Sequence, residues 1–461
     1  MNIPYVLDPS ILREYDIRGI VGDTLSIEDV KVIGRAFGTM LIEKGGKSVA
    51  VGYDGRLSSP GFESALVEGL INTGINVATV GLGPSPMLYY ATHKLNQDAG
   101  LMITGSHNPP DYNGIKMTTF GRSFFADDIQ KLGAQALKGD FAKGCGVVVS
   151  HDIQTSYVDR LLSDYRGTKK LRIAWDPANG AAGEVLVELI KQLPGIHFLI
   201  NEKIDGKFPA HHPDPTVEAN LDQLKILVAE NKCDLGIGFD GDGDRIGIID
   251  QYGRVVWGDQ QLVILAKEVL KEQPGAHIVT DVKASQMFFD EITRMGGKPV
   301  LWKAGHSHIK TKMQELGSPL AGEMSAHIFF KHRYYGYDDA LYAAIRLLSI
   351  LASANQSLAD IYDALPKFEN TPELRFDCPE ERKFKVIDEV RERLSNIDSI
   401  DINNIDGVRI ANDDGWWLLR ASNTQAVLAA RCESTTKEGL KRLKNELMKQ
   451  LTLSGITPPS F

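Results

Sequence analysis

The sequence has few cysteines and no long apolar runs. Its four cysteines, Cys145, Cys233, Cys378 and Cys432, lie far apart and form no Cys-x-x-Cys pair, so neither a zinc site nor a disulfide framework is indicated. No apolar run reaches the ~18 residues of a membrane span, and Met1–Arg18 lacks the basic and apolar regions of a secretory signal. We therefore expect free thiols, a cytoplasmic location and no membrane partner.

Basic residues are too few to balance the acidic ones, and the formal net charge is -9. This balance argues against a nucleic-acid partner, which would need a basic face. An anionic substrate would need a local cluster of arginine, lysine and histidine, because the general field of the protein repels it. With 461 residues, 43% of them hydrophobic, the composition is that of a folded chain of several domains.

A series of short apolar runs and helical stretches occurs three times along the chain. Each copy begins with an apolar run that ends at an aspartate, namely Asp54, Asp176 or Asp281, and closes with a strand followed by a polar loop. Strands that alternate with helices predict a mostly parallel sheet covered on both faces, with ligands beyond the carboxyl ends of the strands. We therefore expect three similar α/β domains that share one site. The predicted helices cover 60–72, 181–192, 221–230, 284–295 and 306–316.

The C-terminal part follows a different pattern. Residues 407–411 and 416–419 flank a polar turn and are typical of a hairpin. A third strand over 426–432 and an amphipathic helix over 436–451 follow, which predicts a small α+β domain. The stretch 367–378 contains or adjoins several prolines and is predicted to be a linker.

The most specific motif is Asp240-Gly241-Asp242-Gly243-Asp244-Arg245. Alternate residues of an extended backbone point the same way, so the three carboxylates should converge. Their mutual repulsion calls for a hard divalent cation with oxygen ligands, magnesium first. An EF-hand loop would need glycine and glutamate where Arg245 and Gln251 stand, which excludes it.

One enzyme alternative remains for this motif. Haloacid-dehalogenase-like phosphatases also place Asp-x-Asp-Gly after an apolar strand and use the first aspartate as nucleophile. Asp240 would then be the nucleophile, with Asp338 and Asp339 as downstream acids.

Three further loops carry reactive or polar side chains, although each alone could be a plain turn. Ser106, in Thr104-Gly105-Ser106-His107-Asn108-Pro109, could be a nucleophile outside the Gly-x-Ser-x-Gly pattern of hydrolases. In the second loop Glu323 and Ser325 share a face and suit vicinal sugar hydroxyls. The third, Arg420-Ala421-Ser422-Asn423-Thr424, suits a phosphate group.

Together the four loops resemble, in order and spacing, those of the alpha-D-phosphohexomutase family, and within it the phosphomannomutase/phosphoglucomutase group. The resemblance covers essentially the whole chain. It implies an α/β fold with three similar mixed α/β domains plus a smaller C-terminal α+β domain around a central cleft. The implied domains are 1–150 with the phosphoserine loop, 151–253 with the metal-binding loop, 254–368 with the sugar-binding loop and 369–461 with the phosphate-binding loop.

The resemblance also implies the reaction. The enzyme would interconvert hexose 1-phosphate and hexose 6-phosphate, of mannose and/or glucose, through a phosphoserine at Ser106 and a hexose 1,6-bisphosphate intermediate. The bisphosphate would also act as an activator. Mg²⁺ would be held by the phosphorylated Ser106 and by Asp240, Asp242 and Asp244. We expect sugar phosphates as the partners and a monomer, with a dimer as the alternative.

The site residues follow from the same resemblance. The catalytic set is Ser106, Arg18, Lys116, His327 and Arg245, with Lys116 and His327 as candidate proton carriers. In the family, the residues that match Glu323 and Ser325 hold the 3- and 4-hydroxyls of the sugar. The implied substrate-binding residues are Tyr15, His107, Lys283, His306, Glu323, Ser325, Arg420, Ser422, Asn423 and Thr424.

The chain departs from the family pattern at two places. Ala326 stands where the family usually has glycine, and Gln425-Ala426 stands where a proline usually follows the phosphate loop. Both changes bear on loop conformation, and neither removes a functional side chain. A non-enzymatic alternative is a sensor that binds hexose phosphates without turning them over.

Overall fold

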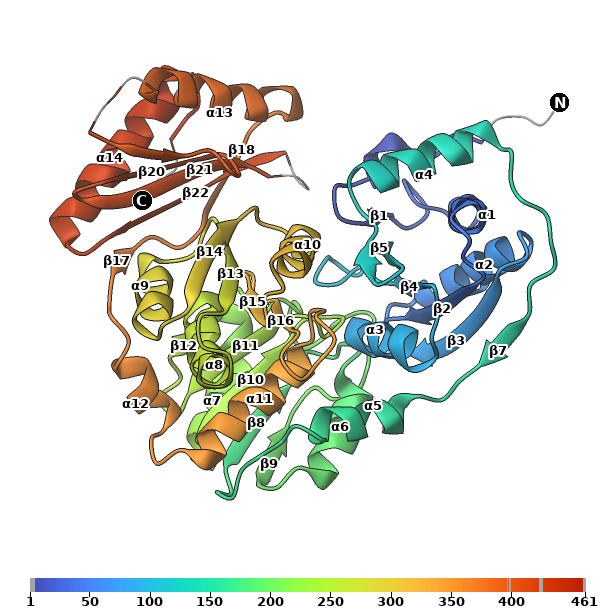
Figure 1. Ribbon diagram of the computed structural model, residues 1–461, viewed down its shortest axis with the longest axis horizontal. Coiled ribbons are helices and arrows are strands. Elements are labelled where there is room, and N and C mark those ends of the chain that lie inside the picture. The colour runs from blue at the N-terminus through green and yellow to red at the C-terminus, as the bar shows by residue number, and fades with distance from the viewer. Residues whose placement is uncertain (1–4, 396, 398, 423–425, 459–461) are drawn as a thin grey trace.

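The computed structural model describes residues 5–395, 397, 399–422 and 426–458. Four β-sheets follow one another along the chain, with helices packed on them (Figure 1). The first sheet consists of β1 (Ile17–Ile20), β2 (Ser48–Tyr53), β3 (Asn76–Leu82), β4 (Ala99–Ile103), β5 (Tyr112–Thr119), β6 (Arg122–Ser123) and β7 (Val148–Ser150). The second consists of β8 (Arg172–Asp176), β9 (Ile196–Leu199), β10 (Leu235–Phe239), β11 (Ile246–Asp250) and β12 (Val255–Val256).

The third sheet consists of β13 (His277–Asp281), β14 (Lys298–Trp302), β15 (Leu320–Gly322) and β16 (Ile328–Phe330). The fourth consists of β17 (Glu369–Asn370), β18 (Leu374–Asp377), β19 (Asp401–Asn403), β20 (Val408–Asn412), β21 (Gly415–Ala421) and β22 (Val427–Ser434).

The helices in the described part of the chain are two short 3₁₀ turns and fourteen α-helices. They are η1 (Pro9–Ile11), α1 (Ile27–Glu43), α2 (Ser59–Ile71), α3 (Ser85–Lys94), α4 (Asp127–Lys138), α5 (Gln154–Leu162), α6 (Gly183–Gln192), η2 (Glu218–Leu221), α7 (Asp222–Asn231), α8 (Gly258–Glu272), α9 (Gln286–Arg294), α10 (His306–Leu316), α11 (Ala340–Ser353), α12 (Leu358–Asp363), α13 (Glu380–Leu394) and α14 (Lys437–Leu453).

The first three sheets share one topology. Their strand orders contain the matching series β3-β2-β4-β5, β9-β8-β10-β11 and β14-β13-β15-β16. In each series the first three strands run parallel and the last runs antiparallel. The expected threefold repetition is therefore confirmed. The parallel strands of each series agree with the prediction, but the sequence did not indicate the antiparallel strand at the end of each series, which makes the sheets mixed.

Side chains alternate between the two faces of the first sheet. Val49 and Val51 of β2 belong to a core with α1, α2 and α4, whereas Ala50 lies in a second core with α3. This second core continues through the second and third sheets. The fourth sheet forms its own core with α13 and α14. The first three sheets thus form one packed body, to which the fourth is attached.

The predicted helices lie where the apolar spacing placed them, within a residue or two at each end. The predicted hairpin is formed by β20 and β21. The predicted linker 367–378 is wrong, because β17 and β18 lie within it and both pair with β22. Prolines such as Pro372 flank short edge strands here, where a missing N–H is tolerated. No helix in the described residues is long and apolar enough to cross a membrane.

The third and fourth sheets meet at the loop that follows β13. Arg409 of β20 donates from Nη1 to the carbonyl oxygens of Val282 and Ala284, at 2.9 and 3.2 Å. Arg431 of β22 donates to the carbonyl oxygen of Lys283 at 2.5 Å. Two arginines of the fourth domain thereby fix the backbone around Lys283, which is one of the predicted site residues.

Candidate active site

Three aspartates converge directly after β10. Asp240, Asp242 and Asp244 are buried, and each offers a carboxylate oxygen within 4.8 Å of the other two. The N–H groups of Asp244 and Arg245 both donate to Oδ1 of Asp240 at 3.1 Å, which closes the loop on itself. Gly243 has φ +72°, a conformation that favours glycine. The loop therefore has the convergent carboxylates that its alternating sequence predicts.

Lys116, on β5, lies among these carboxylates. Its Nζ donates to Oδ2 of Asp242 at 2.7 Å and to Oδ2 of Asp244. Ser85 donates from Oγ to the same oxygen of Asp242. Burial opposes the charge of Lys116, but Asp242 and Asp244 hold its pKa well above the usual range. Lys116 is therefore a cation that faces the aspartate triplet.

The three carboxyl groups differ in their affinity for protons. Burial raises the pKa of Asp240 well above its usual range, and the charges of Asp242 and Asp244 add to this effect. Burial also acts on Asp244, but Lys116 and His327 bring its pKa well below the usual range. The proton is therefore held most tightly at Asp240.

The donor set of the triplet fits a metal ion. Oδ1 of Asp242 is buried and accepts no hydrogen bond from any described residue. Such orphaned acceptors cost free energy unless a cation or donor reaches them. Carboxylate oxygens at close spacing suit a hard divalent cation.

Ser106 lies in the loop after β4 and faces the triplet from the first domain. Its Oγ donates to Oδ2 of Asp240 at 2.9 Å and lies 3.2 Å from Nδ1 of His107. Ser106 has φ +48°, which costs an L-residue roughly 1–2 kcal/mol. Strain of this kind clusters at functional sites, where the surrounding structure enforces it.

Cationic side chains surround the serine. Arg18 of β1 donates from Nη1 to the carbonyl oxygen of Gly105 at 2.8 Å. Burial, together with the charges of Arg245 and Arg18, lowers the pKa of His107 well below its usual range. His107 is therefore neutral at neutral pH, and the arginines supply the positive charge beside Ser106.

The loop after β15 brings together the expected sugar-binding residues. The N–H group of Gly305 donates to Oε1 of Glu323 at 2.6 Å. Oε2 of Glu323 lies 3.0 Å from Nδ1 of His327, and Oγ of Ser325 lies 3.2 Å from the same nitrogen. Burial opposes the charge of His327, but Asp244 and Glu323 raise its pKa to about 9. His327 thus links the sugar loop to the aspartate triplet.

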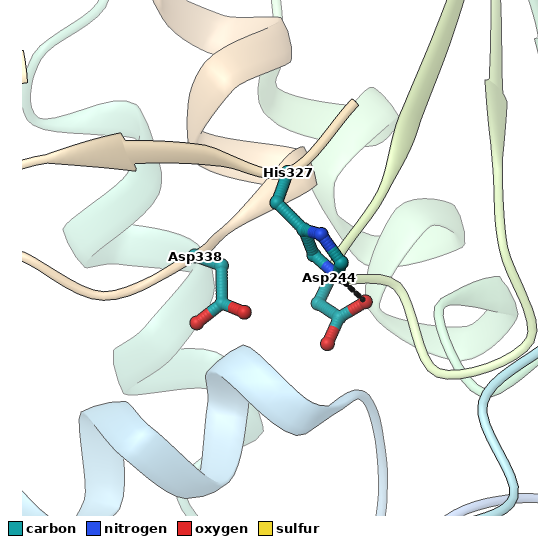
Figure 2. Close-up of side chains that lie close together, drawn as sticks. All are labelled: Asp244, His327 and Asp338. Carbon is teal, nitrogen blue, oxygen red and sulfur yellow. Dashed lines mark ion pairs between the residues drawn. The ribbon is translucent and has the colours of Figure 1, made fainter. Parts of the chain in front are cut away.

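A further acidic side chain lies next to His327 (Figure 2). Asp244, His327 and Asp338 offer ligand atoms within 4.8 Å of one another, and Nε2 of His327 lies 3.2 Å from Oδ1 of Asp244. Lys310 donates from Nζ to Oδ1 of Asp338 at 2.9 Å. Asp338 therefore already has a cationic partner on α10.

Other predicted residues line the same region from the first and third domains. The rings of His306 and His327 lie 5.6 Å apart, and the ring of Tyr15 lies 5.8 Å from that of His306. Lys283 follows β13, and its Nζ lies 3.1 Å from Oε2 of Glu373.

The fourth domain contributes Arg420, which lies on β21. Its Nε donates to Oδ2 of Asp406 at 3.1 Å. Lys383 of α13 donates from Nζ to the carbonyl oxygen of Ser422 at 2.6 Å, so this helix supports the start of the predicted phosphate loop. The predicted residues Asn423 and Thr424 lie outside the described residues.

Ala326 occupies a backbone conformation that favours glycine, with φ +65°. Its N–H donates to the carbonyl oxygen of Glu323 at 2.9 Å, and its own carbonyl oxygen accepts from Ile246 at 3.1 Å. The turn therefore keeps its left-handed residue despite the added methyl group.

Three side chains that the sequence interpretation did not select also contact the site. Ser85 reaches Asp242, Glu373 pairs with Lys283, and Arg56 donates to the backbone of the Ser106 loop. No motif signals Ser85 or Glu373. Arg56 stands two residues after a strand-terminal aspartate, a signal that could have found it.

All four domains match models of one protein family. The phosphoglucomutase/phosphomannomutase alpha/beta/alpha domains I, II and III match residues 9–143, 155–253 and 257–368. The C-terminal domain of the same family matches residues 373–450.

Individual relatives agree with this match. The phosphomannomutase/phosphoglucomutase of Pseudomonas aeruginosa is 43% identical over 445 residues, which cover 96% of either chain. The phosphoglucomutase of Neisseria gonorrhoeae is 40% identical over 94% of this chain and 95% of its own. A crystal structure of a phosphoglucomutase/phosphomannomutase family protein from Burkholderia thailandensis superposes with a TM-score of 0.92 at 38% identity, over 98% of each chain. The chain belongs to the phosphoglucomutase/phosphomannomutase family.

Proposed function

We propose that the protein interconverts hexose 1-phosphates and hexose 6-phosphates, of mannose and/or glucose, with Ser106 as the phosphate carrier. The observation that carries this proposal is the buried hydroxyl of Ser106, which faces Asp240 at 2.9 Å within a ring of cationic side chains. A nucleophile beside clustered cations is the arrangement that phosphoryl transfer requires. The names of the relatives, phosphomannomutase/phosphoglucomutase and phosphoglucomutase, support the same reaction.

Phosphorylated Ser106 would transfer its phosphoryl group to the free hydroxyl of a bound hexose monophosphate. A bond forms between phosphorus and the sugar oxygen, and the bond to Oγ breaks. Lys116 or His327, which carry a proton in the resting site, would donate it to the leaving Oγ and take up the hydroxyl proton in exchange. The hexose 1,6-bisphosphate then turns in the site and returns its other phosphoryl group to Ser106. Arg18 and Arg245 offset the charge of the transferring group. Added bisphosphate would restore phosphate lost from Ser106 and so act as an activator.

Asp240, Asp242, Asp244 and the phosphorylated Ser106 would hold Mg²⁺. The buried Oδ1 of Asp242, which has no hydrogen-bond partner among the described residues, supports this assignment. When bound, Mg²⁺ would supply positive charge at the transferring phosphoryl group.

The remaining residues would bind and orient the sugar phosphate. Glu323 and Ser325 would hold adjacent sugar hydroxyls, while Arg420 and Ser422, with Asn423 and Thr424, would bind the phosphate that is not reacting. Because these groups all belong to one chain, a monomer would suffice for the reaction. The other proposed contacts are Tyr15, His107, Lys283 and His306.

Replacement of the carrier tests the proposal. Ser106→Ala should lower kcat by several orders of magnitude and abolish the phosphoprotein seen by intact mass measurement, because no other hydroxyl replaces the nucleophile. Ser123→Ala is a matched control. Ser123 is a buried serine of the same domain, and its Oγ has no hydrogen-bond partner among the described residues. Near-parental turnover by Ser106→Ala would contradict the carrier role.

The same preparation distinguishes the two alternatives. A phosphatase with Asp240 as nucleophile would carry an acyl phosphate, which hydroxylamine cleaves, whereas phosphoserine resists it. A sensor would bind glucose 1-phosphate without producing glucose 6-phosphate. Family membership favours the mutase over both.

A further inference from the structure

One buried guanidinium group holds the whole Ser106 loop by its backbone. Arg56, between β2 and α2, is 1% exposed. Its Nη2 donates to the carbonyl oxygens of Ser106 and Asn108, at 2.8 and 2.6 Å. Its Nη1 donates to the carbonyl oxygens of Pro109 and Tyr112, at 2.5 and 2.9 Å.

Asp54, the last residue before this turn, completes the arrangement. Its Oδ2 accepts from Nε of Arg56 and from the N–H group of Gly105, both at 3.2 Å. Its Oδ1 accepts from the N–H group of Arg56 at 3.0 Å and from Oγ of Ser59 at 2.7 Å. Every N–H donor of the guanidinium is therefore used, four on the loop and one on Asp54.

The contacts flank the strained position of the loop. Ser106 has φ +48°, and Arg56 binds its carbonyl oxygen while Asp54 binds the residue before it. A Cβ on Gly105 would lie 2.4 Å from Nε of Arg56, so the loop and the guanidinium fit without spare room. Strain at a functional residue persists only where surrounding contacts enforce it. The contacts of Arg56 and Asp54 act together here with those of Arg18 and Thr104 on the same loop.

The third domain shows which part of this arrangement is shared by the repeats. Asp281 also ends the first strand of its copy, and it accepts from the N–H groups of Lys283 and Met324 at 2.8 and 3.2 Å. The basic residue again stands two positions after the aspartate. However, Nζ of Lys283 pairs with Glu373 rather than with carbonyl oxygens of the adjacent loop. The aspartate is thus a common scaffold, and the guanidinium clamp on a loop backbone is particular to the domain that carries Ser106.

We infer that Arg56, fixed by Asp54, is a positioning residue that sets the attack geometry of Ser106 without touching the substrate. The inference rests on the proposed carrier role of Ser106. A planar group with five donors can bind four carbonyl oxygens at once, whereas lysine offers three donors from a single atom. Lysine at this position would keep the positive charge but lose some of the hydrogen bonds to the carbonyl oxygens of the loop. Displacement of a reacting group by about 1 Å can cost about 10²-fold in rate.

Arg56→Lys tests the inference, with Arg346→Lys as the matched control. Arg346 is also fully buried, and it donates to the carbonyl oxygen of His332 and to Glu268, away from the proposed site residues. We expect Arg56→Lys to lower kcat about 100-fold with KM for glucose 1-phosphate within about threefold of the parent. Rephosphorylation of Ser106 by glucose 1,6-bisphosphate, followed by intact mass, should slow in proportion. Arg346→Lys should lower the thermal midpoint and leave kcat within about threefold.

The outcomes separate positioning from general destabilisation. If Arg56→Lys and Arg346→Lys lose kcat equally, or if Arg56→Lys raises KM at unchanged kcat, the positioning role is overturned. If Arg56→Lys does not fold, Asp54→Asn provides the test. This substitution removes the negative charge of the group that accepts hydrogen bonds from Arg56 and Gly105. Lower kcat at unchanged KM then supports the inference, and parental kcat overturns it. Parental activity of Ser106→Ala would instead refute the proposed function.

Discussion

Nζ of Lys116 lies 2.7 Å from Oδ2 of Asp242, inside the cluster where the metal is proposed to bind. Two cations would therefore share the same carboxylates, and the ammonium group lowers the net charge that a metal meets. Removal of the ammonium group of Lys116 should therefore raise the affinity for the metal and lower the catalytic rate.

Lys116→Met should tighten Mg²⁺ binding while lowering kcat. Removal of the competing cation should improve the affinity by about tenfold, which corresponds to about 1.4 kcal/mol. Loss of a cation and proton carrier beside the phosphoryl group should cost about 10²-fold or more in kcat. Calorimetric titration with MgCl₂ measures the affinity, and Lys310→Met is the control, because Lys310 pairs with Asp338 instead. Weaker magnesium binding by Lys116→Met would contradict the competition.

Asp242→Asn should weaken magnesium binding and activity together. A neutral amide replaces a charged oxygen ligand, and the remaining carboxylates attract a hard cation less strongly. As free Mg²⁺ is lowered, kcat of Asp242→Asn should begin to fall at a higher Mg²⁺ concentration than kcat of the parent enzyme. Full activity of the parent enzyme in excess chelator would refute the metal requirement itself.

Ala326→Gly should stabilise the protein. Ala326 has φ +65°, and a Cβ in this region costs about 1 kcal/mol, which exceeds the entropy that glycine adds to the unfolded chain. We expect a gain of about 0.5–1 kcal/mol in urea unfolding. Ala343→Gly, within α11, is the opposite control and should lose about 1 kcal/mol. A loss of stability in Ala326→Gly would show that the methyl group contributes packing that outweighs the strain.

Asp339 should make stability depend on pH. Burial raises its pKa to about 7, although it also accepts hydrogen bonds from Tyr157 and Tyr334. Between about pH 4 and 7 the folded state keeps a proton that the unfolded state has lost, so this group's contribution to stability falls as pH rises. Asp339→Asn should flatten the free energy of unfolding between pH 5 and 7.5 by an amount of the order of a few kcal/mol, whereas the exposed Asp413→Asn should leave it unchanged. Parallel pH profiles for Asp339→Asn and the parent would rule out this linkage.

The site loops were predictable because the functional side chains of each loop are close neighbours in the sequence. Alternating aspartates and glycines after an apolar run predict a metal loop wherever the strand is placed. The contacts between distant segments were not predictable in this way. Ser85 meets Asp242 across 157 positions of the chain, and Arg409 meets Val282 across 127, so both depend on how the domains pack.

The fourth strand of each repeat was missed for a related reason. β11 is buried on both faces and β16 is short, so neither shows an alternation of polar and apolar residues that would mark an antiparallel strand. In β5 the alternation is confined to residues 115–118, and Asn113 and Gly114 precede it. The positions of these three strands beside β4, β10 and β15 become clear only from the strand order of the sheets. The consequence for function is direct, since Lys116 lies on β5 and faces the aspartates from there.

The specificity for the sugar should be set at Glu323. Its Oε1 accepts from the N–H group of Gly305, and its buried Oε2 lies 3.0 Å from Nδ1 of His327. A carboxylate oxygen has two lone pairs, so each oxygen of Glu323 can still accept from a sugar hydroxyl. The resemblance assigns the 3- and 4-hydroxyls to Glu323 and Ser325. Glucose and mannose present these hydroxyls alike and differ only at carbon 2. We therefore expect kcat/KM for glucose 1-phosphate and mannose 1-phosphate to agree within about tenfold, or ~1.4 kcal/mol.

Galactose 1-phosphate should be a far poorer substrate, because its inverted 4-hydroxyl cannot make the hydrogen bond to Glu323 that the other two sugars would make. Glu323→Gln should reduce this discrimination and lower kcat/KM for glucose and mannose phosphates by a similar factor, since an amide matches neither hydroxyl as well. Parallel assays of the three sugar phosphates with parent and variant measure both effects. A ratio beyond a hundredfold between glucose and mannose 1-phosphate would show that another side chain recognises carbon 2. Met324 would then be the first to replace, because it stands between the two hydroxyl-binding residues.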